Sequence, residues 1–263
     1  MSDNAMSRID AVFKQLGHKA LVAYVTVGYP TVESTLEIVP ILAESGCDIV
    51  ELGVPFSDPL ADGATIQEAS FRALQAGVTP QTCLDVVVRI REKTAVPLAF
   101  MTYYNPVLHY GLEPFCTACS RAGIDGLIVP DLPPDESTDL DNAALKNGLD
   151  LIFLLTPAST TERIRLVVEK SRGFVYMVSL LGVTGTRETL PVGLGDFVRR
   201  VRKETARPLC VGFGISTPDQ AQQVGQIADG VIVGSRLVQL IRDDNQPYER
   251  VKSFVRELRT ALG

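Results

Sequence analysis

The sequence lacks the residues that several classes of protein depend on. It has no tryptophan and only two histidines, His18 and His109, in 263 residues, which nearly excludes a metal centre built on histidine. No apolar run reaches the length of a membrane span, and the polar N-terminus lacks the apolar core of a secretion signal. With 25 basic and 31 acidic residues, the net charge of −6 offers no basic surface for nucleic acid or an anionic membrane. An anionic substrate would therefore need a local site.

Cysteine is sparse and unpaired in its spacing. The five cysteines are scattered, and their odd number argues against a disulfide framework and predicts a reducing, cytoplasmic environment. Cys116 and Cys119 have the spacing of a metal or redox pair, but they lie on a predicted helix with no second pair. We interpret them as small buried residues.

What the sequence does contain is a regular alternation of short apolar runs and longer amphipathic stretches. Eight runs are almost continuously apolar, as expected of parallel strands that are covered on both faces. These strand candidates are residues 21–28, 48–54, 97–104, 125–131, 150–157, 173–179, 208–214 and 229–235. Helical patterns separate them, most clearly at residues 31–45, 79–94, 161–171, 194–205, 217–227 and 248–262.

Eight strand–helix repeats in a chain of this length predict a fold of the α/β class, a single-domain (β/α)8 TIM barrel. No linker or change of composition divides residues 1–263. Because Met6 is a second candidate start, we expect residues 1–5 to be a disordered N-terminal extension of that domain.

Two connections that follow strands are unusually rich in turn-forming residues. Residues 55–65 (PFSDPLADGAT) follow the second strand and precede an extra helix. Residues 180–195 follow the sixth strand as a long loop and contain four glycines. Both connections are predicted at the carboxyl end of the barrel strands, where TIM-barrel active sites lie. Long loops at such a position often close over a substrate.

Two acidic residues are candidates for acid–base chemistry. Glu51 lies inside the second strand, and the alternation of strand side chains places it on the same face as Ile49 and Gly53, which we assign to the barrel interior. A carboxyl group there is either a general acid and base with a raised pKa or a structural partner of an arginine. For Asp62, the local sequence favours a simple Asp–Gly turn, although the residue is also a candidate second carboxylate facing Glu51.

Glycine-rich strand ends predict a phosphate site. Residues 212–216 (GFGIS) end the seventh strand, and Gly234 and Ser235 end the eighth strand and begin a helix. Glycines allow backbone N–H groups to approach an anion, and a helix N-terminus favours negative charge. Gly185 in the sixth loop is a further candidate. The alternative is that these glycines only form tight turns.

Aromatic side chains near the strand ends are suited either to lining a pocket for a planar group or to ordinary packing. They are Tyr103, Tyr104 and Tyr176, with Asn105 beside them. The strand candidates contain no lysine, which disfavours an aldolase that works through a Schiff base.

Residues 51–63 (ELGVPFSDPLADG) closely resemble the signature of tryptophan synthase alpha subunits. Supporting matches occur at residues 24–30, 104–106, 130–133, 182–185, 212–216 and 234–235, so the resemblance covers essentially the whole chain beyond Met6. It implies a lyase that cleaves indole-3-glycerol phosphate into indole and D-glyceraldehyde 3-phosphate by a retro-aldol reaction in tryptophan biosynthesis.

The resemblance also implies roles for particular residues. Glu51 protonates C3 of the indole ring, Asp62 accepts the indole N–H, and Thr184 orients Asp62 when the sixth loop closes. The phosphate is held by Gly185, Gly214, Gly234 and Ser235. The rest of the implied substrate site comprises Tyr176 near the glycerol group and the pocket residues Tyr24, Met101, Tyr103 and Phe213. Leu180 and Leu181 are more apolar than the serine/arginine version associated with some members of the family, which concerns the dynamics of the loop and not the reaction.

The same resemblance implies that this chain holds no metal and no cofactor. Pyridoxal phosphate is expected only in a beta subunit that receives the indole, within an alpha2-beta2 heterotetramer, and neither nucleic acid nor a membrane is an expected partner. Other phosphate-binding barrels fit less well, because an epimerase of the metal-dependent type needs more histidine and an indole-glycerol phosphate synthase needs a strand lysine. A barrel that only binds phosphate and regulates a partner would have no need of both Glu51 and Asp62.

Overall fold

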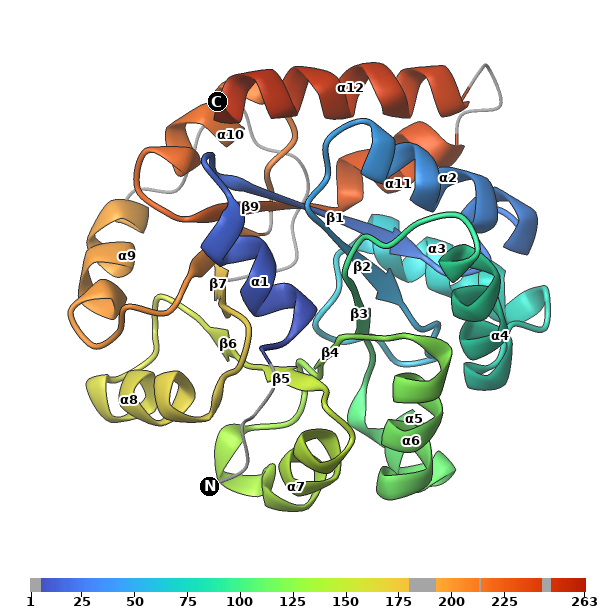
Figure 1. The fold of residues 1–263 in the computed structure, drawn as a ribbon, viewed down its shortest axis with the longest axis horizontal. Coiled ribbons are helices and arrows are strands. Elements are labelled where there is room, and N and C mark those ends of the chain that lie inside the picture. Colours follow the sequence, from blue (N-terminus) through green and yellow to red (C-terminus); the bar gives the residue numbers. More distant parts are fainter. Residues whose placement is uncertain (1–5, 180–192, 213, 243–246) are drawn as a thin grey trace.

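The computed structural model describes residues 6–179, 193–212, 214–242 and 247–263. Within them, nine parallel strands form one sheet that curves into a barrel, in the order β5-β4-β3-β2-β1-β9-β8-β7-β6 (Figure 1). The strands are β1 Ala20–Thr26, β2 Ile49–Gly53, β3 Leu98–Met101, β4 Gly126–Ile128, β5 Asp150–Ile152, β6 Leu154–Leu155, β7 Val175–Val178, β8 Leu209–Gly212 and β9 Gly230–Val233.

The predicted TIM barrel is confirmed, with one difference in its fifth strand. Residues 150–157 form two short strands, β5 and β6, which are separated by Phe153. Because β5 pairs with β4 and β6 pairs with β7, these consecutive strands join the two edges of the sheet and almost close the ring.

Helices surround the strands, and their starts follow local capping chemistry. They are α1 Arg8–Gln15, α2 Val32–Glu44, α3 Ala64–Gln75, α4 Pro80–Arg91, α5 Tyr104–Tyr110, α6 Leu112–Ala122, α7 Thr138–Lys146, α8 Thr161–Lys170, α9 Leu194–Arg202, α10 Pro218–Gly225, α11 Ser235–Arg242 and α12 Pro247–Leu262, with a short 3-10 helix at Pro134–Glu136. Threonine side chains accept the N–H group three residues on at the starts of α2, α4, α8 and α10. Helix α3 lies where the sequence predicts an extra helix. Most of the predicted sixth loop, residues 180–192, lies outside the described residues.

The strands bury both faces, so the molecule has an inner and an outer apolar layer. Alternate residues such as Leu21 and Ala23 pack outward against the helices, whereas Val22 and Tyr24 point into the barrel. Glu51 pairs in register with Tyr24 on one side and Ala99 on the other, and both neighbours belong to the inner layer. This register places the Glu51 side chain inside the barrel, as its position in the strand predicts.

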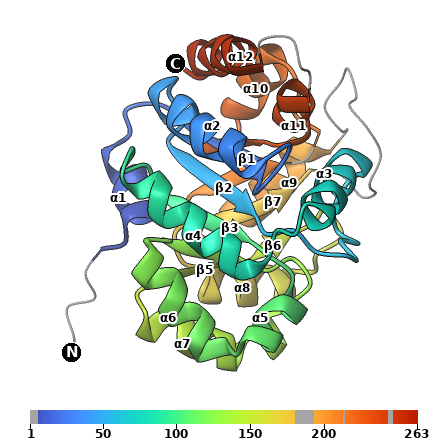
Figure 2. The same ribbon diagram turned by 90° about the vertical axis from the view of Figure 1, so that its right-hand side faces the viewer.

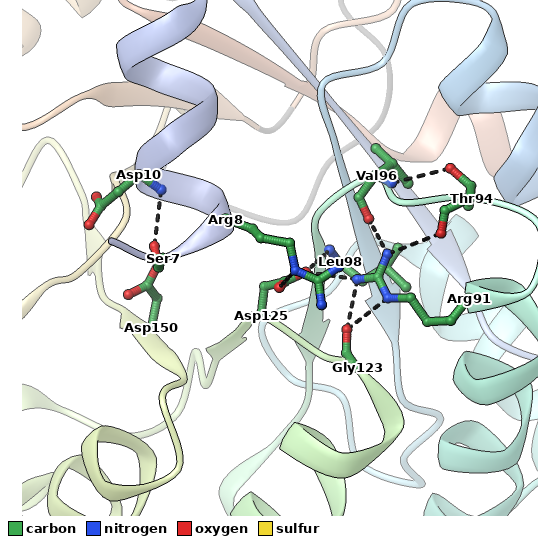
Figure 3. Close-up of polar contacts among 10 residues, drawn as sticks. All are labelled: Ser7, Arg8, Asp10, Arg91, Thr94, Val96, Leu98, Gly123, Asp125 and Asp150. Carbon is green, nitrogen blue, oxygen red and sulfur yellow. Dashed lines mark hydrogen bonds and ion pairs between the residues drawn. The ribbon is translucent and has the colours of Figure 1, made fainter. Parts of the chain in front are cut away.

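Helix α1 closes the amino end of the barrel, a feature that the sequence analysis did not predict. Ile9 is fully buried in the inner layer, and Val12 and Phe13 pack against it. Ser7 caps the helix by accepting the Asp10 N–H, and its hydroxyl group donates to Asp150 at 2.5 Å (Figure 3). Figure 2 shows α1 and α3 at opposite ends of the barrel, so the amino end is sealed by packing while the carboxyl end carries the candidate site.

Three aspartates repeat one arrangement at the amino end. Asp48, Asp125 and Asp229 each directly precede a strand. In each case the aspartate N–H donates to the carbonyl of a leucine on the neighbouring strand, and the N–H of that leucine donates to the aspartate carboxylate. In the Asp125 example, the Leu98 N–H donates to the carboxylate at 2.8 Å, and the Asp125 N–H donates to the Leu98 carbonyl at 2.8 Å. Each carboxylate also binds an arginine: Arg259 for Asp48, Arg91 for Asp125 and Arg202 for Asp229. Each carboxylate therefore has an arginine and a backbone N–H group as partners; Asp125 is buried, and Asp48 and Asp229 are partly exposed.

Candidate active site

Glu51 is a fully buried carboxyl group with no compensating charge among the described residues. None of its side chain is exposed, and neither carboxylate oxygen has a hydrogen-bond partner among the described residues. Burial raises the pKa of Glu51 to about 8, because the ionised form has lost its water without gaining a donor. The structural alternative, a pairing with arginine, is absent from the described part of the chain. Glu51 therefore keeps its proton at neutral pH.

Asp62 lies between β2 and α3 and is nearly buried. Burial raises its pKa to about 6, and a hydrogen bond from the Tyr103 hydroxyl group, at 3.2 Å, opposes that rise. Gln67 on α3 donates to the Asp62 backbone carbonyl at 3.0 Å and so fixes the turn. The local Asp–Gly turn is present, but the carboxylate is turned inward rather than left in solvent, with 6% of the residue exposed. At neutral pH Asp62 is mainly ionised.

Two buried tyrosines link the carboxyl groups in one space. Burial raises the pKa of Tyr24 well above its usual value, and Asp62 and Glu51 both add to that rise. The pKa of Tyr176 is likewise raised by burial, and then by Glu51 and Asp62. Glu51 lies on β2 in register with Tyr24, and Asp62 follows β2 and accepts from Tyr103, which follows β3, so both carboxyl groups are carried by neighbouring strands toward the carboxyl end of the barrel.

Glycines make room for these rings. A Cβ atom on Gly53 would lie 2.1 Å from the Tyr24 hydroxyl oxygen, and one on Gly212 would lie 2.7 Å from that of Tyr176. Each tyrosine thus occupies space that the neighbouring strand leaves free. Met101, at the end of β3 and in register with Gly53, is buried in the same inner layer.

The glycines of the predicted phosphate site lie at the ends of two paired strands. Gly214 follows β8 with a φ of +85°, a conformation that L side chains rarely adopt, and Gly234 stands between β9 and α11. Ser235 begins α11, and the Gly234 carbonyl accepts the Val238 N–H within the first turn. Since β8 pairs with β9 and β9 with β1, these residues lie beside the Tyr24 strand.

Three predicted site residues cannot be placed. Thr184, Gly185 and Phe213 lie outside the described residues, so the contact expected between Thr184 and Asp62 stays a prediction. The structure also adds Phe56, whose ring stacks on Tyr103 with centroids 5.2 Å apart. Its place in the loop after the second strand was the only sequence signal, because stacking across two loops leaves no local pattern.

Features that would indicate other chemistry are missing from the part of the chain that the structure describes. No group of three or more histidine, cysteine or acidic side chains could hold a metal ion there. His18 pairs with Asp48 at the amino end, and His109 is exposed on α5. The five cysteines are free and buried, as interpreted for Cys116 and Cys119. No helix in the described ranges is long and apolar enough to cross a membrane.

A nearly closed parallel barrel with one protonated and one ionised carboxyl group at its carboxyl end defines an acid–base enzyme of the TIM-barrel class. The sequence model of the family described as tryptophan synthase alpha chain matches residues 11–262. The chain is 57% identical over 257 residues to the tryptophan synthase alpha chain of Dehalococcoides mccartyi, covering 98% of this chain and 100% of the relative. Identity to the alpha chain of Geobacter sulfurreducens is 50%, with 98% and 100% covered.

Comparison with solved structures leads to the same family. The fold is similar to that of Mycobacterium tuberculosis tryptophan synthase, with a TM-score of 0.90 and 41% identity over 97% of this chain and 98% of that one. It is also similar to tryptophan synthase subunit alpha from Legionella pneumophila, with a TM-score of 0.90 and 35% identity over 98% of both chains. This chain belongs to the tryptophan synthase alpha chain family.

Proposed function

We propose that this chain cleaves indole-3-glycerol phosphate into indole and D-glyceraldehyde 3-phosphate, the alpha reaction of L-tryptophan biosynthesis, with Glu51 and Asp62 as its catalytic pair. Family membership supports the lyase activity. The observation that carries the assignment of residues is the difference in pKa between the two buried carboxyl groups. The pKa of Glu51 is about 8 and that of Asp62 is about 6, so one is protonated and the other ionised at neutral pH. We further propose that residues 1–263 act as a single domain.

The chemistry needs one acid and one anion. Glu51 donates its proton to C3 of the indole ring, because the ring carbon is otherwise a poor leaving group. The positive charge that results spreads to N1, where the ionised Asp62 accepts the N–H and stabilises it. The glycerol carbon–C3 bond then breaks, its electron pair returns to the ring, and a carbonyl group forms as the glycerol hydroxyl loses its proton. The ionised Glu51, directly or through a relay, takes up that proton and is ready for the next turnover.

The remaining site residues are assigned to binding. Gly214, Gly234 and Ser235 hold the phosphate, joined by Gly185 from the sixth loop, and the N-terminus of α11 favours the anion. Tyr24, Met101, Tyr103 and Phe213 enclose the indole ring. Tyr176 lies beside the glycerol group, and Thr184 orients Asp62.

The reaction uses only side chains, so we propose that this chain needs no cofactor or metal. A beta subunit holding pyridoxal phosphate would take up the indole, in an alpha2-beta2 heterotetramer. The loop of residues 55–62 supports a contact on this side of the barrel, because Leu60 at its tip is 85% exposed. If the partner orders this loop and Asp62, adding a beta subunit should raise the rate of indole formation by at least about tenfold. Asp58→Ala should reduce this stimulation more than it reduces the rate of the isolated chain. Equal rates of indole formation with and without a bound beta subunit would reject the proposal that the partner orders the loop.

The direct test is indole release by the purified chain and by Glu51→Gln. The glutamine keeps the size of the side chain but cannot exchange a proton, so indole formation should fall by at least about a hundredfold while substrate binding changes much less. Glu68→Gln, on α3 and paired with Arg72, removes a glutamate outside the site and should leave the rate unchanged. A parent chain that releases no indole would reject the function, and near-normal turnover by Glu51→Gln would reject the role of Glu51 alone.

A further inference from the structure

Tyr103 contacts the second carboxylate through a hydroxyl group that has only one proton. The Ala61 N–H donates to this hydroxyl oxygen at 2.9 Å, and the hydroxyl donates to Asp62 Oδ2 at 3.2 Å. Since the backbone N–H can only donate, the hydroxyl must accept there and is free to give its proton to Asp62. This arrangement favours an ionised carboxylate, which accepts and has nothing to donate.

The tyrosine ring is held independently of its hydroxyl group. Phe56 stacks on it with an interplanar angle of 28°, and Phe56 is itself fixed by Ser70 on α3. The Ser70 hydroxyl group accepts the Phe56 N–H at 2.9 Å and donates to the Phe56 carbonyl at 3.0 Å. Removing only the Tyr103 hydroxyl would therefore leave the ring in place.

We propose that Tyr103 is a positioning residue for the reaction, whose hydroxyl group keeps Asp62 ionised and oriented to accept the indole N–H. The inference rests on the proposed function and goes beyond the assignment of Tyr103 to the wall of the indole pocket. It gives this residue an electrostatic role that phenylalanine could not fill, whereas a pocket wall would accept either ring.

The other described groups of the site are Glu51, Tyr24, Tyr176 and Gln67. Glu51 from β2 makes no hydrogen bond among the described residues, and the hydroxyl oxygens of Tyr24 from β1 and Thr26 lie 3.3 Å apart, where either can donate. The pKa of Tyr176 from β7 is raised by burial and then by Glu51 and Asp62. Gln67 from α3 binds the Asp62 backbone carbonyl rather than its side chain. Tyr103 is the group whose hydrogen bond lowers the Asp62 pKa against the effect of burial.

The test compares Tyr103→Phe with the parent by titrating the carboxyl carbon of Asp62 by NMR, with the signal assigned through Asp62→Asn. We expect the Asp62 pKa to rise by about one unit, at the lower end for loss of a hydrogen bond to a charged group because the contact is long. The pH profile of indole formation provides the second readout. Its acid limb should move upward by a similar amount, so activity falls by about tenfold below pH 6 and much less near pH 7.5.

Tyr110→Phe is the matched control, because it removes a tyrosine hydroxyl that binds Gln81 at the surface, at 3.2 Å. It should change neither readout. An unchanged Asp62 titration in Tyr103→Phe would overturn the inference, as would a loss of activity that is equal at every pH. Failure of the proposed function would be seen differently, as a parent chain that releases no indole. In that case the NMR titration of Asp62 would still test whether the Tyr103 hydroxyl group keeps Asp62 ionised.

Discussion

Buried carboxyl groups occur at both ends of this barrel, in opposite circumstances. At the amino end, Asp125 accepts the Leu98 N–H and binds both Arg91 and Arg8, at 2.7 Å each (Figure 3). At the carboxyl end, Glu51 is fully buried and has no partner within the described residues. Burial raises the pKa of Asp125 too, but its donors oppose that rise, whereas nothing opposes it for Glu51.

The difference separates stability from function. Removing one partner from a buried ion pair leaves the other charge uncompensated, which lowers the stability of the fold. The paired aspartates at the amino end are therefore expected to matter for folding. A buried carboxyl group left without partners costs stability, and such a cost is typical of a group that is kept for its reactivity. We therefore expect substitutions at the two ends to act in different ways, one on folding and the other on catalysis.

The largest effect on folding is expected at the amino end. Asp125→Ala would leave Arg91 without its carboxylate and the Leu98 N–H without an acceptor, and should lower the free energy of unfolding by about 3–5 kcal/mol. Urea denaturation measures this directly. The rate of indole formation per folded molecule should stay the same, because the residue lies at the opposite end from the site. Asp85→Ala, an exposed aspartate on α4, is the control and should change little. A catalytic defect in the folded Asp125→Ala protein would break the division between the two ends.

A smaller effect on folding, with a larger one on activity, is expected at Gly53. A Cβ atom there would meet the Tyr24 hydroxyl oxygen at 2.1 Å, so Gly53→Ala must displace the ring from its place beside the carboxylates. Overpacking of this kind costs about 1–3 kcal/mol. We expect a loss of indole formation that exceeds the fraction unfolded. At Gly17 at the amino end, an added Cβ atom would meet no atom within 4 Å beyond the neighbouring residues of the chain, so Gly17→Ala should leave both quantities unchanged. If the two alanines behave alike, the close packing of Tyr24 has no role in the site.

The strands of the barrel and the interior position of Glu51 could be predicted from the sequence, because both follow from local patterns. The strand alternation placed Glu51 inside the barrel, and the structure agrees. The apolar runs predicted eight strands, and only the break at Phe153 was missed, because a bend inside a continuous apolar run leaves no composition signal. Helix α1 was missed because its apolar face is short, with Ile9 its only fully buried residue.

The contacts between distant residues could not be predicted. Asp48 and Arg259 are 211 positions apart, and nothing in the sequence near Asp48 indicates its partner. The local sequence around Asp62 indicates a turn and does not indicate that the side chain points inward. That orientation depends on Tyr103, 41 positions away. Local patterns fix which face of a strand a side chain occupies, whereas charge compensation depends on tertiary packing.

The central claim, that Glu51 is kept protonated and uncompensated for catalysis, is tested most directly by the stability of Glu51→Gln as a function of pH. The pKa of Glu51 is about 8 in the folded chain against 4.5 for the ordinary side chain, so the folded state holds a proton that the unfolded state has lost between those values. Parent stability should therefore fall as pH rises from about 5 to 8, relative to the glutamine variant, by up to about 1.4 kcal/mol per pH unit. The account predicts an inactive variant whose relative stability increases across this range. A difference that is constant with pH would show that Glu51 is compensated in the folded protein, and would contradict it.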